Sequence, residues 1–141
     1  MNNSILKLDE FIKNNECDYS RNIISLEVLK MAEDTIGIKF GNQLSDYLLK
    51  YGFLGYKTIE LYGMNSNQGL NSNLFEQTMY LHSSYEITRP YIAIDEINDT
   101  TYALIDSDDN IYICDIEKNV INNADIKLYD YIYKRFKEEM K

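Results

Sequence analysis

The chain has 141 residues, 45% of them hydrophobic, which is enough to bury the core of one compact domain but not of two. Its formal net charge of -9 argues against direct binding to nucleic acid or to an anionic membrane, because both depend on lysine and arginine. We therefore expect a single domain over residues 1–141 whose preferred macromolecular partners are basic proteins.

Three helices are predicted in the first part of the chain, where apolar residues recur every three or four positions. The first follows Ser4. The second runs between Ser25, whose hydroxyl can accept from the first N–H groups of a helix, and Gly37, which can adopt the left-handed conformation that ends one. The third covers residues 42–51, and Asn42 is able to cap it.

A strand, a loop and a fourth helix are predicted in the middle of the chain. Residues 57–62 alternate between apolar and polar side chains, as a strand does. Residues 65–73 are polar and rich in asparagine, which is typical of an irregular surface loop. Residues 73–86 then place Leu74 and Leu81 on one face of a helix.

The last third of the chain is predicted to form an antiparallel meander followed by a helix. Strands are expected over residues 91–95, 101–106 and 111–115, with a tight turn over 107–110 between the last two. Helical spacing then extends over residues 126–140. The predicted fold class is α+β, with helices packed on one face of a small antiparallel sheet.

The meander is strongly acidic, because the segment from Tyr91 to Glu117 contains no lysine or arginine. Its eight carboxylates are Asp95, Glu96, Asp99, Asp106, Asp108, Asp109, Asp115 and Glu117. Carboxylates at this density repel one another unless something cationic covers them, which favours a docking surface for a basic partner or a metal. The alternative is that they only keep the edge of the sheet in water.

The residue types that most enzymes use are sparse in this sequence. His82 is the only histidine, and its place on a predicted helix favours packing over catalysis. The sequence contains no nucleophile elbow, phosphate-binding loop or zinc-protease motif. Cys17 and Cys114 are far apart and are expected to be free thiols. We therefore predict no catalytic residue and no cofactor.

One stretch matches part of a calcium-binding loop. Asp106, Asp108, Asn110 and Glu117 fall at positions 1, 3, 5 and 12 of that motif. Position 6 requires glycine for a sharp turn, whereas the chain has the β-branched Ile111 there, between segments that alternate as strands. No metal ligand is therefore predicted, although an enzyme that uses the carboxylates with a divalent metal remains an alternative.

Tyrosine is also unusually frequent, with thirteen residues in the chain. Tyr91, Tyr102 and Tyr112 lie within the acidic strands. A tyrosine offers a large contact area with little side-chain entropy to lose, which is typical of recognition surfaces. Aromatic residues that alternate along a half-buried sheet can equally fill a core, so both roles remain open.

Several motifs, taken in order, resemble the SUKH superfamily. They are Glu33-x-x-Ile36-Gly37-Ile38-Lys39-Phe40, Tyr47-Leu48-Leu49-Lys50-Tyr51-Gly52, Glu60-Leu61-Tyr62-Gly63, and the hairpin strands Tyr102-Ala103-Leu104-Ile105-Asp106 and Ile111-Tyr112-Ile113-Cys114-Asp115. The resemblance extends from Glu33 to the C-terminal helix. The chain departs from the family at Gly41, where proline is usual.

The resemblance implies a non-catalytic bacterial immunity protein that binds and neutralises a toxin domain encoded beside it, with a nuclease as the expected toxin. Other members of the superfamily are regulatory interaction modules, which is the alternative. A cytoplasmic location is expected, because residues 1–11 lack the pattern of a signal peptide. The predicted partner-binding residues are Asp95, Glu96, Asp99, Tyr102, Asp106, Asp108, Asp109 and Tyr112.

Overall fold

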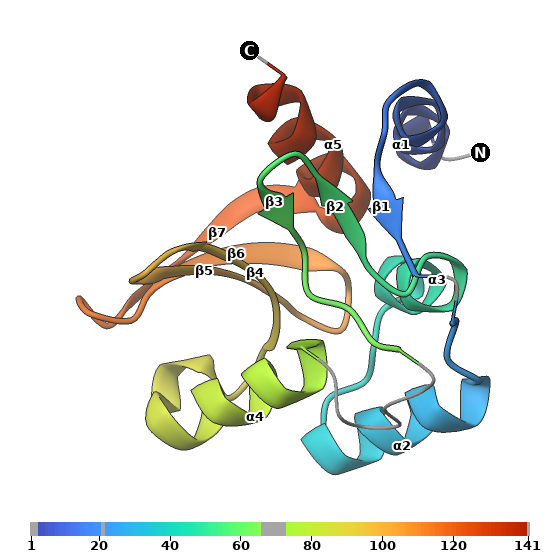
Figure 1. The fold of residues 1–141 in the computed structure, drawn as a ribbon. Coiled ribbons are helices and arrows are strands. Elements are labelled where there is room, and N and C mark those ends of the chain that lie inside the picture. Colours follow the sequence, from blue (N-terminus) through green and yellow to red (C-terminus); the bar gives the residue numbers. More distant parts are fainter. Residues whose placement is uncertain (1–2, 21, 66–72, 141) are drawn as a thin grey trace.

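The structure is a computed structural model that describes residues 3–20, 22–65 and 73–140 (Figure 1). Most of the loop expected over residues 65–73 lies outside the described residues. The helices are α1 (Asn3–Asn14), α2 (Leu26–Ile36), α3 (Asn42–Lys50), α4 (Asn73–Ser84), the short 3-10 helix η2 (Glu86–Thr88) and α5 (Leu128–Glu139). The strands are β1 (Asp18–Tyr19), β2 (Leu54–Tyr56), β3 (Ile59–Glu60), β4 (Ile92–Asn98), β5 (Thr101–Ile105), β6 (Asn110–Asp115) and β7 (Val120–Lys127).

These strands form two antiparallel sheets. The smaller has the order β1-β2-β3 and the larger has the order β4-β5-β6-β7. The two sheets meet where the backbone N–H of Tyr62 donates to the carbonyl of Ile94 at 2.8 Å. The α+β class predicted from the sequence is confirmed.

Helices lie on both faces of the four-stranded sheet instead of one, as Figure 1 shows for α4 and α5. Ala103 and Ile105 point to the face covered by α5 and belong to the main hydrophobic core with Ile132. The intervening Leu104 points to the other face and belongs to a second cluster with Leu81 of α4. Since the strands alternate and neither face is polar, one layer of helices could not have covered both.

The ends of α2 agree with the sequence prediction. The Ser25 hydroxyl accepts a hydrogen bond from the N–H of Val28 at 3.2 Å, which satisfies one of the open donors at the helix start. Gly37 ends the helix with φ of 84°, in the left-handed region that glycine adopts without strain.

The start of α3 differs from the prediction. Asn42 is the first helical residue and Gly41 occupies the cap position, so the expectation that Asn42 caps this helix is wrong. The cap comes instead from the turn between β5 and β6, where the carboxylate of Asp109 accepts from the N–H groups of Gln43 at 2.9 Å and Leu44 at 3.0 Å. A residue more than sixty positions away in the sequence therefore closes the start of this helix.

The strand predictions are confirmed for the meander and incomplete elsewhere. Of the strand expected over residues 57–62, only β3 forms, and β1, β2 and β7 were not expected. β7 has the sequence VINNADIK and lies at the open edge of the larger sheet. Asparagine and aspartate are uncommon in strands, which is why this segment showed no strand pattern.

Candidate protein-binding surface

The Asp95 carboxylate lies inside the protein, only 1% exposed, and is bonded there through Oδ2. It accepts hydrogen bonds from the Tyr131 hydroxyl at 2.6 Å and from Nε of Arg135 at 2.8 Å, both on α5. Burial and the neighbouring carboxylate raise the pKa of Tyr131, so its hydroxyl remains a donor. Asp95 therefore joins β4 to α5, and its charge is not available to a partner.

Asp106 organises the turn between β5 and β6. Its carboxylate accepts from the N–H groups of Asp108 at 2.9 Å and Asn110 at 3.0 Å, from the Asn110 amide at 3.2 Å and from the Tyr112 hydroxyl at 3.1 Å. Burial alone raises the pKa of Asp106, but these bonds outweigh it and hold the pKa below its ordinary value. The Asp106 carboxylate therefore bonds mainly to groups of its own turn.

Apart from the buried Asp95, the acidic residues of the meander lie at two opposite ends of the larger sheet. Thr101 pairs with Asp115 at one end of the central strands, and Ile105 pairs with Ile111 at the other. Thr101 and Ile105 are four residue steps apart along β5, so these ends are separated by about 14 Å at ~3.4 Å per residue. The eight carboxylates therefore do not form one continuous surface.

The end with the β5–β6 turn also contains cations. Lys39 and Lys127 line a hollow of about 840 Å³ together with Asp108 and Asp109. The ammonium group of Lys127 donates to the backbone carbonyl of Asp108 at 2.7 Å. Asp108 is exposed there, but its charge is offset by these lysines, and Asp109 is only 6% exposed beneath it.

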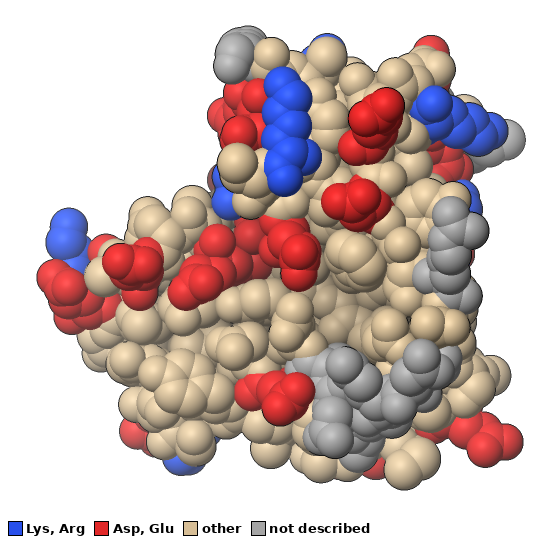
Figure 2. All heavy atoms as spheres, viewed as in Figure 1, with Lys and Arg blue, Asp and Glu red and all other residues tan. Residues whose placement is uncertain are grey.

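The opposite end is the more negative one, and we call Glu96, Asp99, Asp115 and Glu117 the acidic sheet end. Glu96, Asp99 and Glu117 are exposed, and Lys118 is the cation in the adjoining turn. Asp115 accepts from the N–H groups of Glu117 and Lys118 and so shapes that turn. Figure 2 shows carboxylates in a row across the face where Figure 1 places β4.

The three tyrosines of the meander pack against the second hydrophobic cluster. Tyr102 is 6% exposed, and its hydroxyl donates to the Glu96 carboxylate at 3.4 Å. The rings of Tyr91 and Tyr112 lie 4.6 Å apart between centroids. The core-filling role is therefore confirmed for these rings, and the hydroxyls of Tyr102 and Tyr112 donate to carboxylates of their own chain, whereas a recognition role for the tyrosines stays a prediction.

The structure thus divides the eight predicted partner-binding residues. Asp95 and Asp109 are inside the protein and face internal partners. Partner binding remains a prediction for the others, which are Glu96, Asp99, Tyr102, Asp106, Asp108 and Tyr112. The grouping of Tyr62 from the β3–α4 connection, Tyr80 of α4 and Tyr85 before η2 near Tyr102 could not be predicted from the sequence, because it requires the tertiary fold.

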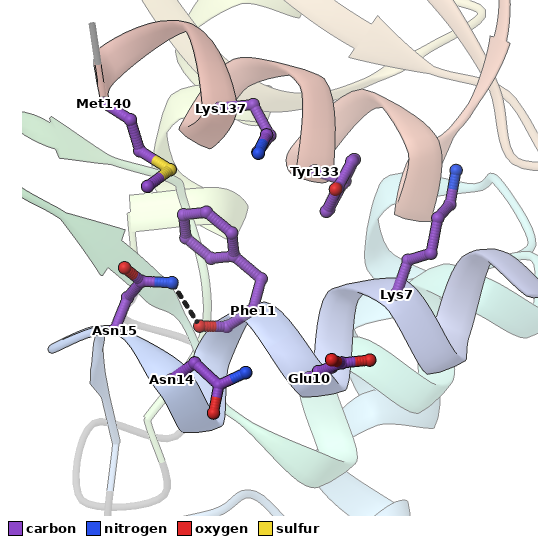
Figure 3. A pocket seen from close by; sticks show the side chains of 8 residues that line it. All are labelled: Lys7, Glu10, Phe11, Asn14, Asn15, Tyr133, Lys137 and Met140. Atoms are coloured by element: carbon purple, nitrogen blue, oxygen red, sulfur yellow. Dashed lines mark hydrogen bonds between the residues drawn. The ribbon is translucent and has the colours of Figure 1, made fainter.

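Two smaller hollows border α5. One, of about 230 Å³, lies between α1 and α5 (Figure 3). The Phe11 ring points toward α5 there, and the ammonium groups of Lys7 and Lys137 lie 5.0 and 5.9 Å from the ring centre of Tyr133. The other, of about 240 Å³, is lined by apolar residues that include Ile97 and by the charged residues Lys134, Arg135 and Glu138 of α5.

His82 makes a contact with the backbone, and no metal-ligand cluster is found among the described residues. His82 is half-buried, with Nε2 2.6 Å from the carbonyl of Tyr91, which is the packing role expected for it. Within residues 3–20, 22–65 and 73–140, no three histidine, cysteine, aspartate or glutamate side chains converge as metal ligands would. In the same part of the chain, no helix has the length and apolar character needed to cross a membrane.

Comparison with known proteins identifies the family. No curated protein matches the chain. The family model SUKH_5, described as SMI1-KNR4 cell-wall, matches residues 1–138, which is nearly the whole sequence. The order of helices and strands described above also follows the motifs that resemble this superfamily. The chain therefore belongs to the SUKH family.

Proposed function

We propose that this protein is an immunity protein that binds and neutralises a toxin domain encoded beside it, without catalysing a reaction. Membership of the SUKH family supports an immunity-type binding module. The observation that supports a basic partner is the acidic sheet end, where Glu96, Asp99 and Glu117 are exposed. These three side chains point to solvent, so their charge is free to attract a partner.

A nuclease is the class of toxin that fits such a surface best. Enzymes that bind nucleic acid use lysine and arginine to contact phosphates, so their active-site grooves are positively charged. The carboxylates of the acidic sheet end present a negative charge similar to that of the phosphates. Complementary charge can also raise the rate of association by about ten- to a thousandfold at low salt.

Survival of cells that express the toxin tests this proposal. The chain is co-expressed with the product of the adjacent gene, and we expect the wild-type chain to restore growth. Charge reversal at the acidic sheet end, with Glu96→Lys, Asp99→Lys and Glu117→Lys together, should weaken protection. The matched control reverses three exposed carboxylates on α2 and α4, with Glu27→Lys, Asp34→Lys and Glu76→Lys, and should protect like the wild type.

Two results would count against the proposal. Cells that die despite good expression of the wild-type chain would remove the immunity role. Equal loss of protection in both triple variants would show that overall charge matters and that the acidic sheet end does not. Asp95 and Asp109 are left unchanged, because their substitution would disturb the fold and confuse the outcome.

A regulatory interaction module is the second candidate, favoured by the family description, which names the cell wall. Such a module would bind several proteins weakly, whereas an immunity protein forms one tight complex. Isolation of the chain from its own cells, with and without the adjacent gene, distinguishes these cases. One stoichiometric partner that disappears with the adjacent gene supports the immunity role.

A further inference from the structure

Glu96 is an exposed carboxylate bordered by aromatic rings. It lies on β4 opposite Tyr102 of β5, on the sheet face that α4 covers. The Tyr102 hydroxyl donates to Oε2 of Glu96 at 3.4 Å. Because the Tyr102 ring is buried, its hydroxyl is held in place and favours one orientation of the exposed Glu96 carboxylate.

Three more tyrosines lie on the same side of the sheet as Tyr102. Tyr62 and Tyr85 pack against the same hydrophobic cluster that contains Tyr102. Tyr80 of α4 and Tyr85, which follows this helix, make an edge-on contact with their ring centres 6.4 Å apart, and Tyr80 is 49% exposed. Burial raises the pKa of Tyr102 to about 12, and the neighbouring Glu96 carboxylate adds to the shift.

The chain itself supplies no cation to this group among residues 3–20, 22–65 and 73–140. The three ion pairs there involve other carboxylates, namely Asp130, Asp9 and Asp95. The lysines that lie over tyrosine rings in the same residues do so at Tyr51, Tyr56 and Tyr133. Glu96 therefore has a hydroxyl donor from its own chain but no positive charge opposite it.

We propose that Glu96, Tyr62, Tyr80, Tyr85 and Tyr102, which we call the Glu96 site, bind an arginine side chain presented by a protein partner. Phenol rings attract cations through the negative potential of their faces, and a carboxylate accepts two parallel hydrogen bonds from a guanidinium. Arginine combines ring stacking with that bidentate geometry, whereas lysine offers a point charge. This inference relies on the proposed function for its choice of a basic protein as the partner.

Other occupants fit the site less well. An apolar side chain would cover Glu96 and leave its charge without a partner, which is unfavourable. An acidic side chain would be repelled by the same carboxylate. Tyrosine and arginine are also the residues most often found at the energetic centre of protein interfaces, so this site matches an anchor position in a complex.

A titration with a short peptide tests the site without the toxin. The isotope-labelled full chain is followed by nuclear magnetic resonance while acetyl-Gly-Arg-Gly-amide is added. The matched peptide contains citrulline, which has the shape of arginine without its charge. We expect the largest shifts at the backbone signals of Glu96 and Tyr102, and only with the arginine peptide.

Variants then separate the site from the general negative charge of the chain. Glu96→Gln should weaken binding of the arginine peptide about tenfold, since it removes a hydrogen-bonded ion pair. Tyr80→Leu, at an exposed ring, should weaken it by about threefold. Glu138→Gln removes the same charge from exposed α5, on the opposite face of the sheet, and should leave binding at this site unchanged.

Equal weakening by Glu96→Gln and Glu138→Gln would overturn the proposal, as would equal binding of the citrulline peptide or shifts spread over all acidic regions. These results are independent of the toxin assay. If the wild-type chain protects cells but the peptide does not bind at Glu96, the Glu96 site is wrong and the immunity role stands. If the peptide binds there but cells are not protected, the immunity role fails and the site stands.

Discussion

The Asp106 carboxylate accepts four hydrogen bonds from its own turn and from β6, and these bonds favour its charged form. Because they hold the pKa of Asp106 below its ordinary value, this residue stabilises the folded chain fully above the pKa of an unfolded aspartate, about 3.9. The stabilisation is lost as the pH falls through the lower pKa of the folded state. The hairpin turn is therefore expected to be sensitive to acid.

Asp106→Asn should lower the free energy of unfolding at neutral pH and should reduce its dependence on pH. The difference from the wild type should be largest above about pH 4 and should shrink at lower pH, where the wild-type carboxylate is also protonated. Urea unfolding followed by circular dichroism between about pH 7 and about pH 3 measures this. Asp108→Asn, at an exposed position in the same turn, should give a curve parallel to the wild type. If the free energy of unfolding of Asp106→Asn differs from that of the wild type by the same amount at every pH, this prediction is wrong.

At the scale of elements, the β5–β6 turn and α3 depend on each other. Gly41 precedes α3, and a Cβ at this position would overlap the carboxylate of Asp109. The absence of a side chain at Gly41 therefore allows Asp109 to reach the N–H groups of Gln43 and Leu44. Asp109 itself has φ of 67°, which aspartate adopts more readily than most residues.

Gly41→Ala and Asp109→Gly should each destabilise the protein by about 1–2 kcal/mol, because each removes the cap of α3. Glycine is chosen at position 109 because it adopts positive φ without strain. The double variant should lose less than the sum, since the alanine has nothing to displace once the carboxylate is gone. Urea unfolding of the four proteins measures the coupling. Strict additivity would show that Gly41 and Asp109 act independently.

The contact between β4 and α5 depends on a buried ion pair. Arg135→Ala would leave the Asp95 carboxylate buried without its cation, and we expect a loss of about 3 kcal/mol. Asp95→Asn should cost less, because the Arg135 side chain is 23% exposed and can turn to water. Lys134→Ala, at an exposed neighbour on α5, should change stability by under about 0.5 kcal/mol. A greater loss of stability for Asp95→Asn than for Arg135→Ala would show that the buried carboxylate does not depend on its cation in this way.

Elements with a local pattern could be predicted from the sequence. The five helices follow apolar spacing, and Ser25 and Gly37 mark the ends of α2 by their own side-chain and backbone preferences. Contacts between distant residues could not be predicted in this way. The cap that Asp109 provides to α3 and the pairing of β7 with β6 exist only because the sheet brings those segments together.

The candidate site was only partly predictable for a related reason. The sequence shows how many carboxylates the meander contains, but it does not show on which face of the sheet each of them lies. Regular alternation would place Asp95 on the same face as Ala93, whereas an irregularity between them sets Asp95 opposite Ala103, on the face that α5 covers. Glu96 then faces α4. One extra residue in β4 thus decides which carboxylate is internal and which faces water.

At the scale of the whole molecule, the carboxylates behind the net charge of -9 differ in whether they are bonded within the chain or exposed to solvent. Asp95, Asp106 and Asp109 are engaged by groups of their own chain, whereas Glu96 and Asp99 remain in solvent. Only exposed charges that face the partner steer its approach, because salt screens charges farther than about 8 Å away at physiological ionic strength. The salt dependence of association should therefore depend on position and not on net charge.

Two triple variants with the same net charge test this expectation, since each changes -9 by +3 to -6. One has Glu96→Gln, Glu117→Gln and Asp99→Asn at the acidic sheet end, and the other has Glu27→Gln, Glu76→Gln and Asp34→Asn on α2 and α4. Association with the toxin domain is measured by stopped flow at several salt concentrations. The first variant should associate about tenfold more slowly at low salt and show a weaker salt dependence, whereas the second should follow the wild type. Equal slopes for the two variants would mean that the partner approaches from another side of the molecule.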